Sequence, residues 1–359
     1  MMKVVVVTMV IGFLVTNGPM CAQAHIHKPA GQVVARRNFS CILVFGDSSV
    51  DPGNNNYLNT TFRANFPPYG NNLFNRQSTG RFTNGRLPTD MTAEALGIKS
   101  MIPAFLDPNL GKEDLLTGVS FASSASGYDN LTAELTNVLP VSKQLEYFRH
   151  YKVQLREFVG AKKAENTVKN AIFILSMGTN DFLQNYFLEP TRSKQFTVKQ
   201  YADYLTTCMA EDIKEMHRLG ATKLVVVGLP PLGCMPVVKT LSGATKCVDS
   251  YNKAAFLMNL KITKKLAMLR RSLGMKIGYE DIYILFERAM NSPLDYGFTM
   301  TSKGCCGSGT IEFGATCRGQ IPCKHPSKYM FWDAVHPTEA MYKIVSDDVC
   351  RMISRNLLT

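Results

Sequence analysis

The sequence predicts a three-layer α/β/α sandwich built on a central parallel sheet. Short apolar runs typical of buried strands alternate with longer segments whose apolar residues recur at helical spacing. Polar, turn-forming residues follow several of the apolar runs directly. Strands that alternate with amphipathic helices form parallel sheets through right-handed crossovers, with helices on both faces. Because ligands bind beyond the carboxyl ends of such strands, the polar residues there are the first candidates for a site.

The expected elements follow one another in a regular order. Strands are expected at 41–45, 171–176, 223–227 and 276–279, and helices at 88–96, at 141–159, around 201–216, at 251–273 and from Pro337 onward. Gly220 and Gly274 end two of these helices, as glycine commonly does. The long stretch 51–86 is rich in aromatic residues and is expected to form a folded lip rather than a disordered loop, and 281–326 is expected as a second loop region beside the pocket. No linker or repeat interrupts the chain, so one domain from residue 38 to 359 is predicted.

The N-terminus is typical of a secretory signal peptide. Lys3 precedes an apolar run from Val4 to Val15, and small residues lead to an expected cleavage near Ala24, so residues 1–24 are assigned to the signal. The run is too short to span a bilayer, and no later stretch is long and apolar enough to do so. The predicted destination is extracellular. Three sequons agree with secretion and are candidate glycosylation sites: Asn38, Asn59 and Asn130.

The ten cysteines indicate disulfides rather than a metal site. Six of them cluster late in the chain: Cys234, Cys247, Cys305, Cys306, Cys317 and Cys323. In an oxidising compartment such clusters staple loops, whereas no Cys-x-x-Cys pair with nearby histidines supports zinc. The sequence does not determine which cysteines pair with which. Removal of the signal peptide takes Cys21 with it and leaves nine cysteines, so at least one thiol must be unpaired. Cys41 and Cys208 lie in apolar sequence patterns, which suit buried free thiols.

The formal charge of +12 favours acidic surroundings. Lys3 is the one charged residue of the signal, so the mature chain keeps +11. The basic residues are scattered rather than gathered with aromatic residues, which argues against nucleic-acid recognition. A solvated basic surface is the simplest interpretation, and weak adhesion to anionic cell-wall polymers or lipid head groups is the alternative.

The stretch from Cys41 to Ser49 is where a nucleophile is expected. An apolar run suited to a strand covered on both faces stops at Gly46, which lets the backbone turn and present Ser48. Read alone, Gly-Asp-Ser is also ordinary turn chemistry. A serine becomes a nucleophile only when a base and oxyanion donors lie beside it.

The later strands and the last helix supply candidates for those partners. Asp333 precedes His336 by three positions, so it can accept the Nδ1 proton and leave Nε2 free as a base. The alternative is a helix-capping Asp333 and a surface histidine. The candidate oxyanion donors are the N–H of Ser48, the N–H of Gly127 and the side-chain amide of Asn180; a loop glycine and a turn-capping asparagine are the alternatives for the last two.

Several sequence blocks, in order, carry a resemblance to a known family. They are 45–49 (Phe-Gly-Asp-Ser-Ser) with 51–56, 67–70 (Pro-Pro-Tyr-Gly), 79–86, 118–123 with Gly127, 178–181 (Gly-Thr-Asn-Asp) and 331–338 (Phe-Trp-Asp-Ala-Val-His-Pro-Thr). Together they resemble the plant-type GDSL esterase/lipases of the SGNH hydrolase superfamily over nearly the whole mature chain. Two departures are Ser49 in place of the leucine of the family name and Ser120 where many relatives carry asparagine. No Gly-x-Ser-x-Gly occurs, which counts against the α/β-hydrolase fold.

The resemblance implies a flavodoxin-like SGNH hydrolase fold and a secreted serine esterase or lipase of the apoplast or cell wall. It implies Ser48 as nucleophile, His336 as base, Asp333 as its orienting acid, and Ser48, Gly127 and Asn180 as the oxyanion hole. The expected partner is a small-molecule, lipid or polysaccharide ester, with no metal or organic cofactor. Two alternatives remain: an acyltransferase with the same triad, and a non-catalytic protein that binds cell wall or lipid.

Overall fold

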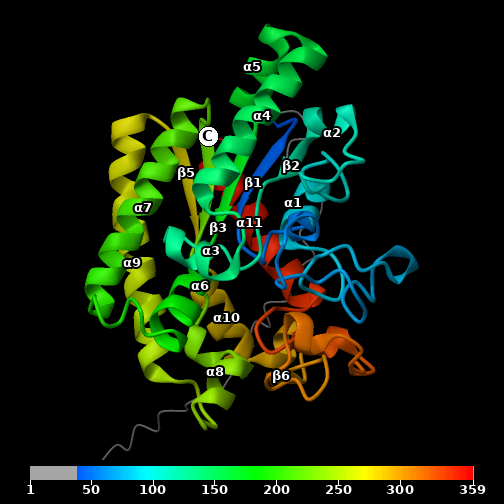
Figure 1. Ribbon diagram of the computed structural model, residues 1–359, viewed down its shortest axis with the longest axis vertical. Helices are drawn as coiled ribbons and strands as arrows, with labels where there is room; N and C mark the ends of the chain where they lie inside the picture. The colour runs from blue at the N-terminus through cyan, green and yellow to red at the C-terminus, as the bar shows by residue number, and fades with distance from the viewer. Residues whose placement is uncertain (1–38, 359) are drawn as a thin grey trace, which may run out of the picture. The chain divides into compact units, whose positions relative to one another are not determined.

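The computed structural model describes residues 39–358, and its centre is a five-stranded, all-parallel sheet in the order β2-β1-β3-β4-β5. The strands are β1 (Ile42–Gly46), β2 (Gly118–Ser120), β3 (Ile172–Ser176), β4 (Lys223–Val227) and β5 (Lys276–Glu280). Helices cover both faces, so the predicted three-layer α/β/α sandwich is confirmed (Figure 1). All these described residues lie in one compact unit.

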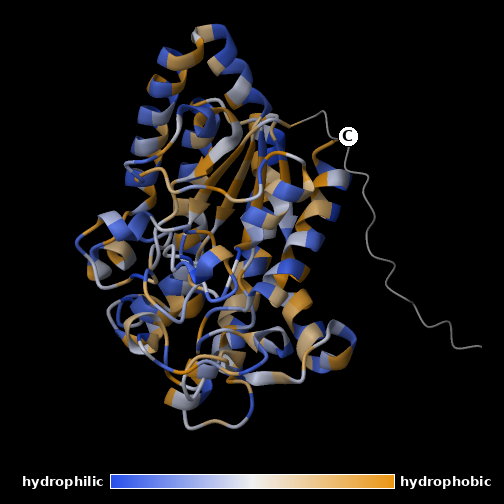
Figure 2. Ribbon diagram, turned by 90° about the vertical axis from the view of Figure 1, so that its right-hand side faces the viewer, coloured by the Kyte–Doolittle hydropathy of each residue, from blue (hydrophilic) through white to orange (hydrophobic). Residues whose placement is uncertain are grey.

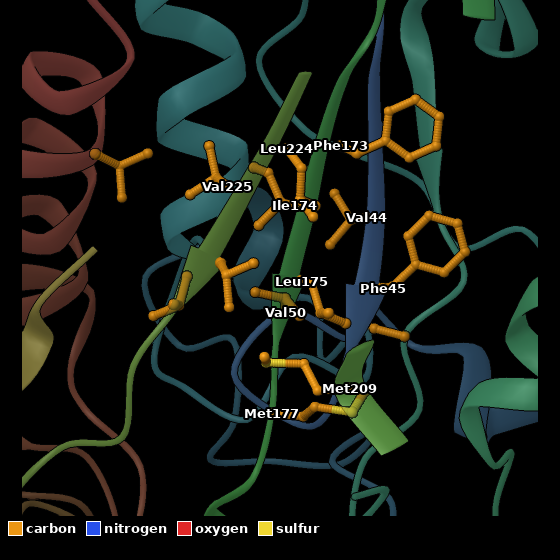
Figure 3. Close-up of a cluster of buried hydrophobic side chains, with 14 of the residues drawn as sticks. Val44, Phe45, Val50, Phe173, Ile174, Leu175, Met177, Met209, Leu224 and Val225 are labelled. Carbon is orange, nitrogen blue, oxygen red and sulfur yellow. The ribbon is translucent and has the colours of Figure 1, made fainter. Parts of the chain in front are cut away.

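The central strands form because both of their faces are buried. Every residue of β1 and β3 is buried, which explains why the two strands appear as continuous apolar runs. Phe45 and Phe173 point to one face, where the Phe148 ring of α4 (Val141–Val159) lies 5.7 and 5.4 Å from theirs. Their neighbours Val44 and Ile174 are paired in register and point to the other face (Figure 3).

The helices divide between the two faces of the sheet. α4 (Val141–Val159), α7 (Val198–Arg218) and α9 (Asp249–Leu273) lie on one face, and α1 (Pro88–Ala95) and α11 (Glu339–Asn356) pack together on the other (Figure 1). In Figure 2 the strands are mostly hydrophobic, whereas the helices carry both hydrophobic and hydrophilic residues along their length. The remaining helices are α2 (Lys112–Thr117), α3 (Asn130–Thr136), α5 (Ala161–Asn170), α6 (Thr179–Phe182), α8 (Pro236–Leu241) and α10 (Ile282–Asn291).

The strand order creates a crevice between β1 and β3. The chain crosses from β1 to β2 in one direction and from β3 to β4 in the other, so the connections separate at the carboxyl ends of these two strands. Ser48 lies just after β1, and Asn180 lies just after β3 in α6. Two of the candidate site residues therefore flank this topological switch point.

Most predicted elements are confirmed, with two corrections. The last helix begins at Glu339 rather than at Pro337, because the Thr338 hydroxyl accepts a hydrogen bond from the Met341 N–H and caps the helix. The segment 281–326 is not all loop, because α10 occupies Ile282–Asn291 with a strongly apolar inner face.

A small, disulfide-stapled cap lies beyond the carboxyl ends of the strands, which we define as residues 300–331. β6 (Met300–Gly304) pairs with β7 (Tyr329–Phe331), and the cap appears in orange and red near the β6 label in Figure 1. The expected disulfides are confirmed as Cys234–Cys247, Cys305–Cys323 and Cys306–Cys317. Among the described cysteines, Cys41, Cys208 and Cys350 are unpaired; Cys41 is buried as expected, whereas Cys208 is only half-buried.

Some of the sequence-based assignments concern the chain termini and surface. The signal peptide 1–24 and the sequon at Asn38 lie outside the described residues. Asn59 and Asn130 are both exposed. Within residues 39–358, no helix has the length and hydrophobicity needed to cross a membrane.

The lip formed by 51–86 is anchored by a buried ion pair. Arg81 donates to both carboxylate oxygens of Asp90 at 2.8 and 2.9 Å, and to the backbone oxygen of Ile102 at 2.8 Å. Arg81 and Asp90 are 4% and 0% exposed. A buried carboxylate that loses its cation is costly, so this pair holds the lip against α1.

Replacing Arg81 by Met should lower the free energy of unfolding by about 3–5 kcal/mol, because it leaves the Asp90 charge buried without a counterion. Arg86→Met is the matched control. Arg86 pairs with Glu94 and Glu339 at the surface, so its loss should cost below about 1 kcal/mol. Urea unfolding followed by fluorescence of the buried Trp332 measures both variants. Equal urea midpoints for Arg81→Met and Arg86→Met would contradict the structural role of Arg81.

Candidate active site

Ser48 is presented by a turn that only glycine can begin. A Cβ at Gly46 would lie 2.2 Å from the backbone oxygen of Ser176 on β3, so any larger residue would push the two strands apart. The Asp47 N–H donates to the same Ser176 oxygen at 3.0 Å. The turn after β1 is thereby fixed against the end of β3, and Ser48 lies in the crevice between them.

His336 and Asp333 lie beside Ser48. The Nε2 of His336 is 2.9 Å from the Ser48 hydroxyl, and its Nδ1 is 2.8 Å from Asp333 Oδ2. Ser48 and His336 are 8% and 6% exposed, and Asp333 is fully buried. With the proton on Nδ1 directed at the carboxylate, Nε2 is left to accept a proton from the serine.

The Asp333 carboxylate is held by four donors. Its Oδ1 accepts from the backbone N–H groups of Val335 and His336 at 2.8 and 2.7 Å. Its Oδ2 accepts from the Tyr69 hydroxyl at 2.7 Å as well as from the imidazole. These bonds satisfy a charge that would otherwise be expensive to bury, and they fix the orientation of the imidazole.

Tyr69 connects the acid to the lip and to the cap. Its hydroxyl donates to Asp333 and accepts from the backbone N–H of Gly314 in the cap at 2.7 Å. Burial and the nearby Asp333 charge raise the pKa of Tyr69 well above its usual value, so the phenol stays a donor. The Phe82 ring packs 5.7 Å from Tyr69 and 4.8 Å from the His336 ring, which confines both side chains.

The side-chain amide of Asn180 is oriented by two hydrogen bonds. Asn180 Nδ2 donates to the Ser126 backbone oxygen at 2.9 Å, and its Oδ1 accepts from Gln184 at 3.2 Å. This sets the amide orientation and leaves one Asn180 N–H uncommitted. Among the hydrogen bonds of residues 39–358, none uses the backbone N–H of Ser48 or Gly127. These N–H groups therefore have no protein partner among the described residues, and an oxyanion hole requires such uncommitted donors.

Asp181 shapes the loop that carries Gly127. Its carboxylate accepts from the N–H groups of Tyr128 and Asp129 at 2.9 and 3.1 Å, and from the Thr132 hydroxyl at 2.6 Å. A Cβ at Gly127 would lie 2.2 Å from Asp181 Oδ1, so the loop passes too close for any other residue. Burial raises the pKa of Asp181 to about 7, although these hydrogen bonds favour the ionised form.

Asp47 and Ser49 stabilise the turn around the serine. Asp47 Oδ1 accepts from the N–H and the hydroxyl of Ser49 at 2.9 and 2.8 Å. The Ser49 hydroxyl also lies 3.0 Å from that of Ser176. Burial raises the pKa of Asp47 to about 6, and its bonds to Ser49 and the proximity of His336 limit the rise. Among residues 39–358, neither side chain forms a hydrogen bond with the Ser48 hydroxyl, so both act on Ser48 through the backbone of the turn.

Two cavities open onto Ser48, Asn180, Val335 and His336. The outer groove has a volume of about 400 Å³ and is lined by residues of the lip, of α8 and of the cap, among them Phe62, Phe82, Leu241 and Phe313. The inner slot has a volume of about 100 Å³ and runs between the sheet and helices α1, α10 and α11. The walls of both are predominantly apolar. Across residues 39–358, no cluster of side chains suited to a metal ion occurs.

Sequence reasoning did not find the supporting residues. Tyr69 was noted only as part of a family block, and its contact with Asp333 spans 264 positions. Gln184 and the backbone of Gly314 carry no local signal for their contacts with Asn180 and Tyr69. For Asp181 alone, its position directly after Asn180 was a hint.

A serine hydroxyl bonded to an imidazole that is held by a buried carboxylate is the arrangement of serine hydrolases. Comparison with known proteins agrees. The family model described as GDSL-like lipase/acylhydrolase matches residues 42–349. A GDSL esterase/lipase of Arabidopsis thaliana is 48% identical over 358 residues, covering 100% of both chains, and another from the same plant is 43% identical over 311 residues, covering 85% of this chain and 89% of the relative.

Among solved structures, the similarity is more distant. A lipase from a goat rumen metagenome is 12% identical, with a TM-score of 0.41, and the match covers 87% of this chain and 96% of that one. An acetylxylan esterase from Geobacillus stearothermophilus is 14% identical, with a TM-score of 0.39 and coverage of 88% and 94%. The family match and the plant relatives are decisive: the chain belongs to the GDSL-like lipase/acylhydrolase family and is a carboxylic ester hydrolase.

Gly127→Ala should lower kcat/KM for a short-chain ester by about 10²-fold or more, because the methyl group displaces the loop from Asp181 and moves its N–H. Gly243→Ala is the control: that glycine has a φ of +60° but nothing within 4 Å of an added Cβ. It should cost about 1–2 kcal/mol of stability while hydrolysis is retained. Wild-type hydrolysis by Gly127→Ala would contradict the tight fit of this loop.

Proposed function

We propose that the enzyme hydrolyses carboxylic esters through an acyl-enzyme on Ser48, with His336 as base, Asp333 orienting it, and Ser48 N–H, Gly127 N–H and Asn180 Nδ2 as the oxyanion hole. The observation that carries the proposal is the continuous chain of short contacts from Ser48 Oγ through His336 to Asp333, at 2.9 and 2.8 Å. The proposal needs no metal or organic cofactor.

In the first half-reaction, Ser48 Oγ attacks the ester carbonyl carbon while its proton passes to His336 Nε2. The carbonyl oxygen becomes an oxyanion that the three donors stabilise. The carbon–oxygen bond to the alcohol then breaks, and the alcohol departs with the proton from His336. Asp333 stays ionised throughout and stabilises the transient imidazolium.

In the second half-reaction, water takes the place of the alcohol. His336 Nε2 removes a proton from the water as it attacks the acyl carbon, and the same donors hold the second oxyanion. When the bond between the acyl carbon and Ser48 Oγ breaks, the serine recovers its proton and the acid leaves. The apolar walls around His336 and Asn180 keep this charge chemistry in a poorly hydrated site, where hydrogen bonds to the oxyanion are strong.

We further propose that the protein is secreted after removal of residues 1–24 and acts outside the cell, as a single hydrolase domain from residue 38. Three disulfides in the described part of the chain support an oxidising compartment. The exposure of Asn59 and Asn130 leaves both accessible for glycosylation. The net charge of +11 that the chain keeps without residues 1–24 supports weak adhesion to anionic cell-wall polymers.

Ser48→Ala should abolish hydrolysis of a chromogenic short-chain ester, whereas Asn180→Ala should reduce kcat by about 10²–10³-fold and leave residual activity, because two donors remain. A fluorophosphonate probe should label the wild type and Asn180→Ala but not Ser48→Ala. Unchanged turnover in Ser48→Ala would overturn the mechanism. Absence of labelling in the wild type would favour a non-catalytic binding protein.

Tyr69→Phe should lower kcat by about 10-fold with little change in KM, because Asp333 loses a donor worth about 1.5–3 kcal/mol. With fewer donors the carboxylate attracts the imidazole proton more strongly, so the acid limb of the kcat/KM profile should move to higher pH. Tyr204→Phe on α7, where the ring packs on Phe196, is the control and should leave the limb in place. If the acid limb of the kcat/KM profile stays in place in Tyr69→Phe, Tyr69 acts only in packing.

A further inference from the structure

The two cavities at Ser48 differ in volume and in the exposure of the side chains that line them. The rim of the outer groove carries apolar side chains that are about half exposed: Leu188 at 51%, Leu241 at 54% and Ile311 at 49%. The inner slot is instead walled largely by buried residues, including Phe286 at 4%, Val345 at 6% and Val349 at 4%. Both cavities reach solvent, but the rim of the groove carries exposed side chains, whereas the walls of the narrower slot are buried.

The inner slot follows the face of the sheet behind the serine. Ile174 of β3 and Val227 of β4 form one wall. Val345 and Val349, one turn apart on α11, form part of the facing wall, and Phe286 of α10 adds to it. These walls are mostly apolar, although Asp47, Thr92 and Tyr342 also line the slot. An apolar chain is the best occupant, because most polar groups there would lose their hydration.

The order of the chemical steps assigns a substrate part to each cavity. The alcohol must leave after the first half-reaction, and water must then reach the acyl carbon from the side of His336. The acyl group stays attached to Ser48 through both events. The narrow slot with buried walls suits the part that stays, and the wider groove with an exposed rim suits the part that is exchanged.

We infer that the enzyme prefers esters of a short, straight-chain carboxylic acid with a larger apolar alcohol, with the acyl chain in the inner slot and the alcohol in the outer groove. The inference rests on the proposed function, since it needs the acyl-enzyme on Ser48. A volume of about 100 Å³ is below the ~150 Å³ of a cavity that holds benzene, so it suits a straight chain of about four carbons and excludes an aromatic acyl group. The outer groove, at about 400 Å³, accepts a bulkier group.

Val345 gives the sharpest test, because it lies on the wall of the slot and does not line the groove. Chromogenic esters with one alcohol and acyl chains from acetyl to octanoyl are compared by kcat/KM. Wild type should favour butanoyl. Val345→Ala should raise the ratio of hexanoate to butyrate about 10-fold, and Val345→Phe should lower the ratio of butyrate to acetate by at least as much, since one methylene in an apolar pocket changes discrimination by about 10–200-fold.

Leu241→Asp on the groove rim is the matched control. It should reduce the preference for large alcohols in a series of butyrate esters while leaving the acyl ratios within about twofold of wild type. Ratios measured within one variant do not depend on the amount of folded enzyme, and the Ala and Phe substitutions at 345 change the slot in opposite directions. Acyl ratios that respond to Leu241→Asp, or that ignore both Val345 variants, would overturn the assignment of the acyl chain to the slot.

Failure of this inference is distinguishable from failure of the proposed function. If Ser48→Ala is inactive but the Val345 variants keep the wild-type acyl profile, the mechanism stands and only the location of the acyl chain is wrong. If Ser48→Ala retains hydrolysis, the acyl-enzyme itself is wrong, and the assignment of both cavities falls with it.

Discussion

The arrangement of the site depends on one buried charge, the carboxylate of Asp333. A carboxylate with no exposure is tolerated only when its oxygens are satisfied, and here two backbone N–H groups, the imidazole of His336 and the phenol of Tyr69 satisfy them. Because Tyr69 also accepts from Gly314, the same charge joins the lip, the cap and the segment before α11. The hydrogen bonds that satisfy Asp333 therefore position the imidazole of His336. They also hold the lip and the cap, which form walls of the outer groove, next to each other.

The sheet supplies the other half of the site. Ser48 and Asn180 follow the adjacent strands β1 and β3, whose connections leave in opposite directions, so their side chains face a crevice that the topology itself creates. Close backbone approaches hold this half in place, with Gly46 against Ser176 and Gly127 against Asp181. Ser48 and Asn180 thus lie at the centre of the fold, whereas His336 comes from the segment before α11.

Sequence patterns were sufficient to predict those features that depend on interactions between residues close together in the chain. Apolar runs revealed the strands because parallel strands are buried on both faces, and helical periodicity revealed α4, α7 and α9. Asp333 and His336 lie three positions apart, so their pairing was visible along the chain. The start of α11 was misplaced by two residues, because the capping bond of Thr338 competes with the helix-starting preference of Pro337.

The sequence by itself determined the fold class, the presence of disulfides and the residue types able to form an esterase site, since these follow from periodicity, composition and short spacings. Only the tertiary structure decided that Tyr69 supports Asp333 across 264 positions, that Gln184 orients the Asn180 amide, and that Ser48 stands between a narrow slot with buried walls and a wider groove with an exposed rim. The physical reason is that contacts of this kind, and the volume between packed side chains, depend on how distant segments dock rather than on any local preference.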